Sequence, residues 1–212
     1  MPETNASKKM KFGIIGSGGK HGPRLIKYLA QFGEICWTCN GSDHVRAGEA
    51  VDWVFISAPN LFHYEYALEF LRAGVNVFLE KPPTLSVESF ENLISLAKAN
   101  KINLYVDDVF LFRKDIVWPE KLKSEENISW SKVEAESGAL LDRLTYHHLY
   151  LLNRYADDDS DITNIIVYER KSSRIDFSFE YHGANFRSTY TCGAAISENI
   201  FLGVPIESNA GS

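Results

Sequence analysis

A glycine-rich run between an apolar segment and an amphipathic one most restricts the fold of this chain. Residues 10–15, Met-Lys-Phe-Gly-Ile-Ile, have the composition of a short buried strand, and the run from Gly16 to Gly22 follows at once. Apolar residues then recur at helical spacing as far as Phe32, where Gly33 offers a stop. This order predicts a strand, a tight turn and a helix, which is the opening unit of a parallel α/β sheet.

The alternation of strand and helix signals continues to about residue 106. Asn60 and Ser86 are N-cap residue types at the start of helical patterns, and Gly74 is placed to end the first of them. The run 53–57 is apolar on both faces, so we expect both faces of the sheet to be covered. Further strands are expected at residues 34–39, 53–57, 75–79 and 102–106. The pattern predicts a doubly wound parallel sheet, an abbreviated Rossmann fold, in a domain spanning residues 1–112.

The pattern changes after residue 112 and predicts a second, small α+β domain over residues 113–212. A helix is expected from about Ala139 to Tyr155. Strands are expected near 162–169, 174–181 and 184–192, with Gly183 in a hairpin turn. We expect an antiparallel sheet with that helix on one face. The other face, with the aromatic residues Tyr181, Phe186 and Tyr190, is expected to meet a second subunit in a homodimer or higher oligomer.

Composition excludes several classes of protein. The chain has 212 residues and a formal net charge of -6, which argues against a protein that grips nucleic-acid phosphates. No apolar run approaches the roughly 20 residues of a membrane helix, and the polar N-terminus lacks a signal-peptide core. A soluble, cytoplasmic protein without membrane or nucleic-acid partners is therefore expected. Cys36 and Cys39 match C-x-x-C but lie in an expected strand without further ligands nearby, so we expect no metal site.

The glycine turn has the context that a dinucleotide site requires. Backbone amides at such a turn approach a pyrophosphate at the helix N-terminus, so Gly16, Ser17, Gly18 and Gly19 are candidate cofactor-binding residues. The third glycine position of G-x-G-x-x-G holds His21, and Gly22 comes one residue late.

Two neighbouring features bear on the choice of cofactor. Lys20 and His21 would add positive charge near a phosphate. At the end of the second strand Asn40 stands where an acidic residue usually marks NAD, so both NAD and NADP stay open as cofactors.

Two further motifs resemble those of the Gfo/Idh/MocA oxidoreductase family. The first is Ser57-Ala58-Pro59-Asn60-Leu61-Phe62-His63, and the second is Glu80-Lys81-Pro82. Within this family the sugar-nucleotide 3-dehydrogenases look most similar over this stretch. The resemblance implies a Rossmann domain followed by an α/β domain whose open sheet often forms the dimer interface. It also implies a hydride transfer between NAD or NADP and a hydroxyl or carbonyl carbon of a sugar, sugar nucleotide or polyol.

The resemblance also implies residue roles. Pro59, Asn60 and His63 would border the nicotinamide, with Ser57 and Pro82 beside the cofactor as well. Glu80 would lie by the ribose, and Lys81 near the nicotinamide and the substrate hydroxyl. The Lys81–Pro82 bond is expected to be cis. The chemistry supports Lys81 independently, because hydride removal from a secondary alcohol needs a base or an electropositive group at its oxygen.

A second catalytic segment lies on the helix expected from Ala139. It resembles the family's helix with an aspartate and, four residues later, a histidine. Asp142 matches, but Tyr146 stands four residues on and His147 comes one place later. On a regular helix Asp142 and Tyr146 share a face. An extra residue or a π-bulge would bring His147 into place instead. The unperturbed pKa of histidine favours His147 as the acid/base, and Tyr146 stays open as the alternative.

One departure from the family supports a second hypothesis. Only about a dozen residues separate the strand ending near Cys39 from the strand starting near Asp52, where the family normally fits another helix and strand. A non-catalytic dinucleotide- or sugar-binding relative, acting as a regulatory or assembly subunit, is therefore the alternative to an enzyme.

Overall fold

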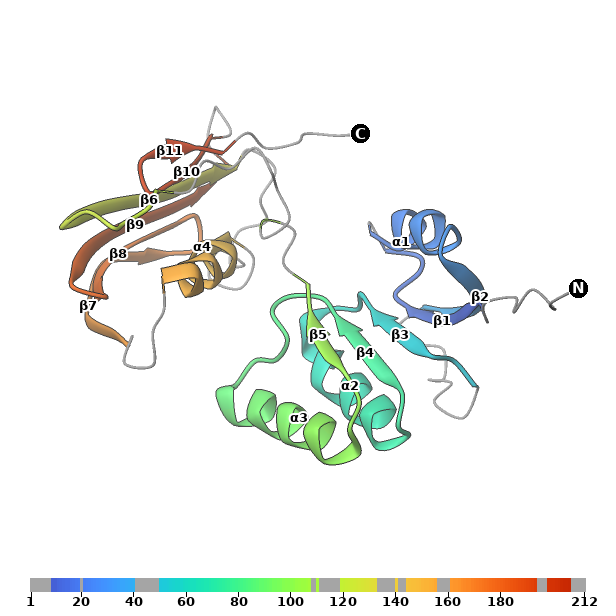
Figure 1. The fold of residues 1–212 in the computed structure, drawn as a ribbon. Helices are drawn as coiled ribbons and strands as arrows, with labels where there is room; N and C mark the ends of the chain where they lie inside the picture. Colours follow the sequence, from blue (N-terminus) through green and yellow to red (C-terminus); the bar gives the residue numbers. More distant parts are fainter. Residues whose placement is uncertain are drawn as a thin grey trace, which may run out of the picture. The chain divides into compact units, whose positions relative to one another are not determined.

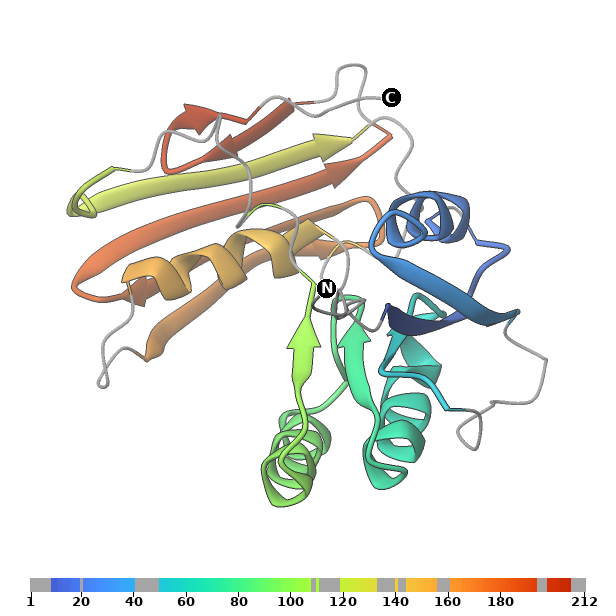
Figure 2. The same ribbon diagram turned by 45° about the vertical axis from the view of Figure 1, so that its right-hand side comes forward.

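The chain forms two compact units, residues 1–107 and residues 108–212. The computed structural model describes residues 9–19, 21–40, 50–107, 110, 119–132, 140, 144–155, 161–193 and 198–206. The first unit holds strands β1–β5 and helices α1–α3, and the second holds strands β6–β11 with helix α4 (Figures 1 and 2). None of the described helices is long and apolar enough to span a membrane.

The first unit is built on a parallel five-stranded sheet with the order β2-β1-β3-β4-β5. The strands are β1 (Met10–Ile15), β2 (Gly33–Cys39), β3 (Trp53–Ile56), β4 (Asn76–Leu79) and β5 (Leu104–Val106). Every strand expected here is confirmed, and the predicted fold class with it. The order reverses direction at β1, so the crevice outside the carboxyl ends of β1 and β3 is the switch point where such sheets bind ligands.

Three helices connect these strands, namely α1 (Gly22–Leu29), α2 (His63–Arg72) and α3 (Val87–Asn100). Ser86 caps α3 as expected, because its side-chain oxygen accepts a hydrogen bond of 3.2 Å from the Ser89 N–H. The expected cap at Asn60 is wrong. Asn60 opens a short 3-10 turn (Asn60–Phe62) that runs directly into α2. Gly74 follows α2 with a φ of +77°, which suits glycine at a helix end.

The two faces of this sheet differ in how they are covered. On one face Ile56 and Leu79 pack against α2 and α3 in a core that includes Phe70. On the other face Phe55 stacks on Phe78 at 4.7 Å, Phe78 stacks on Tyr105 at 5.0 Å, and all three stay half-buried. These three rings of β3–β5 are therefore only partly covered. Within the described residues, α1 contacts β1 and β2 instead.

The second unit is a six-stranded sheet with the order β11-β10-β6-β9-β8-β7. The three expected strands are confirmed as β7 (Ile162–Lys171), β8 (Arg174–Tyr181) and β9 (Ala184–Cys192). Three more were not expected: β6 (Glu125–Lys132), β10 (Glu198–Phe201) and β11 (Val204–Pro205). β6 pairs with β9 in parallel, so the sheet is mixed where a purely antiparallel sheet was expected.

Helix α4 (Tyr146–Leu152) covers one face of this sheet and continues as a 3-10 turn, η4 (Asn153–Tyr155) (Figure 2). Its residues Leu151 and Leu152 are buried against aromatic side chains of the sheet. The turn just before α4 is π-helical at Leu144 and Thr145.

The placement of the sheet aromatics on a subunit-facing surface is wrong. Tyr181, Phe186 and Tyr190 are only 4%, 1% and 0% exposed and belong to the core beneath α4. The hairpin register explains this. Tyr181 pairs with Ala184 across the His182–Gly183 turn, which puts the alternate residues of both strands on a single face.

Candidate functional site

The glycine turn closes the switch point between β1 and β3. Gly16 has a φ of +85°, and the N–H groups of Gly16 and Ser17 donate to the Cys39 carbonyl at 2.9 and 3.2 Å. A Cβ atom on Gly16 would lie 2.2 Å from the Ser57 carbonyl oxygen. Both the backbone angle and this contact require glycine, so the chain brings the ends of β1 and β3 together here.

Asn40 supports the turn from the end of β2. Its side-chain oxygen accepts hydrogen bonds from the Gly18 N–H at 2.6 Å and from the Ser17 hydroxyl at 3.1 Å. An acidic residue at this position would face a ribose, whereas the Asn40 amide oxygen is engaged by the turn itself. Asn40 is thus joined to the glycine turn and adds no negative charge to it.

Gly22 fills the role that the sequence pattern left open. It is the first residue of α1, and a Cβ on it would lie 2.0 Å from the Ser17 carbonyl oxygen. The third glycine of a dinucleotide turn serves this kind of close packing between the helix and the loop that precedes it. The signal was present in the sequence, displaced by one residue from the fixed motif.

The turn fits a pyrophosphate. A Cβ on Gly19 would meet only the Gly16 carbonyl oxygen, at 3.3 Å. Among the described residues, no side chain therefore covers the backbone at Gly19. The first turn of α1 holds no acidic residue and carries Arg24, which favours an anion at the helix N-terminus. His21 directly precedes α1, and Lys20 lies outside the described residues.

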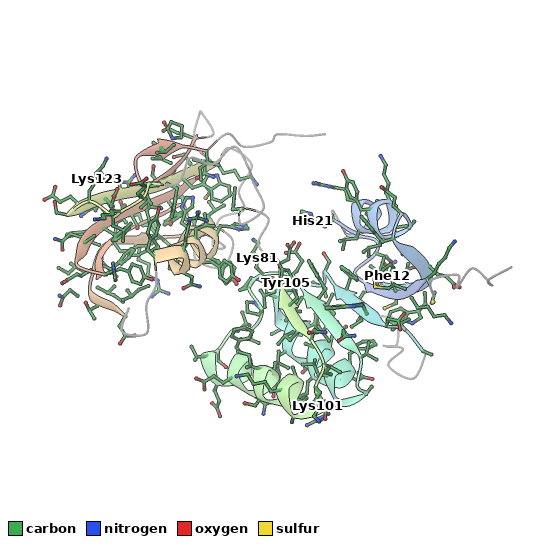
Figure 3. The ribbon with its side chains drawn as sticks, viewed as in Figure 1. Phe12, His21, Lys81, Lys101, Tyr105 and Lys123 are labelled. Carbon is green, nitrogen blue, oxygen red and sulfur yellow. The ribbon has the colours of Figure 1, made fainter. Side chains whose placement is uncertain are left out.

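Glu80 and Lys81 follow β4 at the same edge of the sheet. The Glu80 N–H donates to the Ile56 carbonyl at 2.9 Å, and the Lys81 N–H donates to the Glu80 carboxylate at 3.2 Å. The Lys81–Pro82 bond is cis, as the resemblance implied. Figure 3 places half-buried Lys81 at the carboxyl end of the sheet and Lys101 at the opposite end.

His63 lies beneath this edge and is fully buried. Its Nδ1 is 2.8 Å from the Pro82 carbonyl oxygen, and its Nε2 is 2.8 Å from the Ala58 carbonyl oxygen. Burial lowers the pKa of His63, the two carbonyl contacts oppose that shift, and the charge of Lys81 lowers it further. His63 therefore touches both loops that carry the candidate cofactor residues.

The candidate acid/base residues of the second unit have different surroundings. His147 is 8% exposed, and its ring meets Phe110 edge-on at 4.8 Å and Trp130 at 5.8 Å. Tyr146 is half-buried and stacks on Tyr150 at 5.6 Å. A π-helical turn at Leu144 and Thr145 lies directly before these two residues. This is the kind of irregularity that was expected if His147, and not Tyr146, is the acid/base residue. Asp142 lies outside the described residues.

A buried polar network, which the sequence did not suggest, holds α4 to its sheet. His148 Nε2 is 2.7 Å from the Asn199 side-chain oxygen, and Nδ1 is 3.2 Å from the Tyr190 hydroxyl. Burial lowers the pKa of His148 to about 3, so the ring is neutral at ordinary pH. A neutral ring that donates to Asn199 accepts from Tyr190, and both ring nitrogens are then satisfied. The network fixes the rotation of α4, and with it the side on which His147 lies.

The structure thus groups most of the candidate residues into two sets. Gly16, Ser17, Gly18, Asn40 and Ser57 meet at the switch point, and His63 links the adjoining loops of the same unit. Pro59 and Asn60 follow Ser57 in one of these loops, and Glu80, Lys81 and Pro82 form the other. Tyr146 and His147 belong to the second unit. Cys36 and Cys39 lie in β2 and are not joined by a disulfide, and the Cys39 carbonyl supports the glycine turn.

The fold and the glycine turn define a Rossmann-type dinucleotide-binding unit. Residues 29–108 match the family model described as "Oxidoreductase family, NAD-binding Rossmann fold". This part of the chain is thus similar to the Gfo/Idh/MocA family, and the match lies in the first unit.

Relatives and solved structures agree with this assignment. A scyllo-inositol 2-dehydrogenase (NADP(+)) of Bacillus subtilis is 40% identical over 60 residues, which cover 28% of this chain and 18% of the relative. A UDP-N-acetylglucosamine 3-dehydrogenase from Acidithiobacillus ferrooxidans has a TM-score of 0.73 at 16% identity, covering 90% of this chain and 69% of that one. The WlbA dehydrogenase from Thermus thermophilus, solved with NAD and α-ketoglutarate, has a TM-score of 0.73 at 18% identity, covering 96% and 84%.

The solved structures establish a shared fold, at identities too low to establish more. The chain spans about half the length of an oxidoreductase from Streptococcus pneumoniae, 48%, at 24% identity over 68% of this chain. The activity, substrate and partners of this protein are therefore proposals.

Proposed function

We propose that the protein transfers a hydride between NAD or NADP and a hydroxyl or carbonyl carbon of a sugar, sugar nucleotide or polyol. The observation that carries the proposal is the glycine turn at the switch point, with Lys81 at the end of a neighbouring strand of the same sheet. The relatives named above act on an inositol and on a sugar nucleotide, which supports the substrate class.

The residues of the first unit have separable roles in this proposal. The backbone of Gly16 to Gly19 receives the pyrophosphate, and Asn40 keeps that turn in shape. A bound nicotinamide supplies or accepts the hydride. Ser57, Pro59 and Asn60 would border the nicotinamide along the carboxyl edge of the sheet, and Glu80 would lie by the ribose. Lys81 contacts the substrate oxygen, where its ammonium or amine holds or takes the proton of the reacting hydroxyl.

The second unit is proposed to supply Asp142 and one acid/base residue. His147 is the better candidate because Leu144 and Thr145 form a π-helical turn directly before α4, and such a turn adds one residue to the helical spacing. A histidine also titrates near neutral pH, which suits proton transfer to or from a substrate hydroxyl. Tyr146 stays the alternative, and single substitutions of each residue distinguish the two.

Titration with NAD, NADH, NADP and NADPH tests the cofactor part directly. We expect at least one of the four to bind the wild-type protein. Gly18→Val should abolish binding, because a side chain there blocks the approach of a phosphate to the backbone. Gly19→Val should also weaken binding with less damage to the turn, since a Cβ on Gly19 would meet only the Gly16 carbonyl oxygen, at 3.3 Å. Unchanged affinity in both variants would contradict the proposal.

A non-catalytic role is the second candidate, and one observation favours it. Only residues 40–52 join β2 to β3, and β2 is the edge strand of the sheet on that side. The adenosine end of the site has correspondingly little chain around it. Tight dinucleotide binding, with neither reduction of NAD or NADP by sugars and inositols nor oxidation of NADH or NADPH by keto-sugars, would favour this candidate.

We also propose that two copies of the chain associate through the sheet of the second unit, at β7. This edge strand exposes Ile162, Ile165, Ile166, Val167 and Tyr168, each between 41% and 61%. Asp161 precedes the strand and Lys171 ends it, so antiparallel pairing of two copies sets opposite charges together. The open face of the sheet is polar, with Arg187 paired to Asp176 at 2.7 Å.

Sedimentation velocity at micromolar concentration tests this association. The wild-type protein should sediment as a dimer or larger, and Ile166→Lys should shift it to a monomer. Val87→Lys is the matched control, because Val87 is 74% exposed on the first unit and lies outside the proposed contact. A wild-type monomer across the whole concentration range contradicts the proposed contact.

A further inference from the structure

His63 contacts two loops that carry different parts of the proposed site. One loop follows β3 and contains Pro59 and Asn60. The other follows β4 and contains Lys81. The imidazole has a backbone carbonyl oxygen from each loop at 2.8 Å, one on each ring nitrogen.

The Lys81 loop has few backbone donors of its own. Pro82 and Pro83 are consecutive, and neither has an N–H group. The Pro82 carbonyl, directly after Lys81, is therefore one of the few groups through which this loop can be held. His63 is fully buried on the first turn of α2, a rigid element whose core residue Phe70 is also fully buried.

We propose that His63 is a positioning residue that ties the loop after β3 to the loop after β4 and so fixes Lys81 relative to the cofactor-side residues. The role of Lys81 in this inference rests on the proposed function, whereas the contact between the two loops does not. His63 was expected to border the nicotinamide. Its contacts instead direct both ring nitrogens to the backbone.

The protonation state sets how this tie works. A neutral imidazole has one N–H and one lone pair, so it donates to only one of two carbonyl oxygens at a time. The imidazolium donates to both. Burial and the positive charge of Lys81 both lower the pKa of His63, which keeps the ring neutral at ordinary pH. The tautomer then decides which loop holds the hydrogen bond, while the ring fills the space between both.

Amide hydrogen exchange on the ligand-free protein tests the tie without any cofactor or substrate. In His63→Ala the amides of residues 60–62 and those of Lys81 and Thr84 should exchange about tenfold faster or more, as expected for a lost buried hydrogen bond. The strand residues 53–56 and 76–79 should be unaffected. His63→Gln, which retains a donor and an acceptor, should restore part of the protection. His182→Asn, at an exposed histidine of the second unit, should change neither loop.

A second readout reports on Lys81 itself. Labelling of lysine amines, followed by mass spectrometry, should show a changed rate at Lys81 in His63→Ala. Lys101, at the opposite end of the same sheet, should keep its rate (Figure 3). Faster exchange in only one of the loops, or an unchanged Lys81 rate, would overturn the tie. If His63→Ala unfolds, the same two comparisons are made on His63→Gln. A protein that binds none of the four dinucleotides defeats the proposed function and leaves this test intact.

Discussion

The two units of this chain differ in how their polar residues are used. In the first unit the carboxyl edge of a parallel sheet gathers backbone groups, with Gly16 and Gly18 at one strand end and Lys81 at another. In the second unit the polar groups His148, Tyr190 and Asn199 are buried under a helix, where His148 contacts the other two. The first arrangement leaves a surface for a ligand, whereas the second fixes a helix on a sheet.

This difference matches the roles that we propose for the two units, cofactor binding in the first and placement of an acid/base residue in the second. Binding of the cofactor depends on backbone shape, which glycine supplies and a single Cβ can destroy. The placement of an acid/base residue depends on helix rotation, which the network around His148 sets. Substitutions in the glycine turn should therefore change cofactor affinity, whereas those at Lys81 and at the acid/base residue of α4 should change turnover.

The largest effect is expected on turnover, once a substrate is identified. Lys81→Ala should keep cofactor affinity and lower kcat by about 10²- to 10⁴-fold, the range for a lost acid/base group. His147→Ala should fall in the same range, whereas Tyr146→Phe should lose less than about tenfold. Steady-state kinetics and cofactor titration on the three variants provide the measurement. A Tyr146→Phe loss as large as that of Lys81→Ala would assign the role to Tyr146 instead.

Unit one could be predicted largely from the sequence, because its strands are continuous apolar runs between glycine and cap residues. The second unit was harder for two physical reasons. In β6 most residues are polar, and Ile128 and Trp130 are its only buried apolar side chains. Strands β10 and β11 are very short. The aromatics of β8 and β9 were misplaced because only the register across Gly183 decides which face they share.

The candidate site divides in the same way. The glycine turn and Glu80-Lys81-Pro82 are local motifs, and the structure finds them at one sheet edge. Gly22 stands one residue after the third glycine position of the motif, so the sequence pattern alone did not assign its role. The contacts from His63 to Pro82 and from His148 to Asn199 join residues far apart in the chain, and no local pattern indicates them.

The next effect compares the acid stability of the two units. His148 has a pKa of about 3 when folded and its ordinary value near 6.5 when unfolded, so the unfolded chain binds the proton first. The stability from the neutral ring is present above pH 6.5 and is lost as the pH falls from there towards 3. The free energy of unfolding of the second unit should fall by up to about 1.4 kcal/mol per pH unit in this window.

Hydrogen exchange resolved by unit, at several pH values, measures this loss. The first unit should follow the same direction through His63, whose pKa is also lowered by burial. His148→Gln should make the free energy of unfolding of the second unit less dependent on pH and leave that of the first unit unchanged. His182→Asn, at an exposed histidine, is the control. Equal slopes in wild type and His148→Gln would show that this histidine does not carry the effect.

The smallest effect concerns the choice between the two dinucleotides and lies wholly in the first unit. Asn40→Asp keeps an oxygen that can accept from the Gly18 N–H, so the turn should hold its shape. The new carboxylate adds a negative charge at the strand end where a ribose hydroxyl is read, and it should repel a 2′-phosphate. We expect NADPH to bind about tenfold more weakly relative to NADH than in wild type, the factor that 1.4 kcal/mol produces. Parallel fluorescence titrations of both cofactors, with Asn40→Ala beside them, give the comparison. Asn40→Ala removes the acceptor and should weaken both cofactors alike, because the turn loses its support. A ratio unchanged in Asn40→Asp would place the adenosine ribose away from the end of β2.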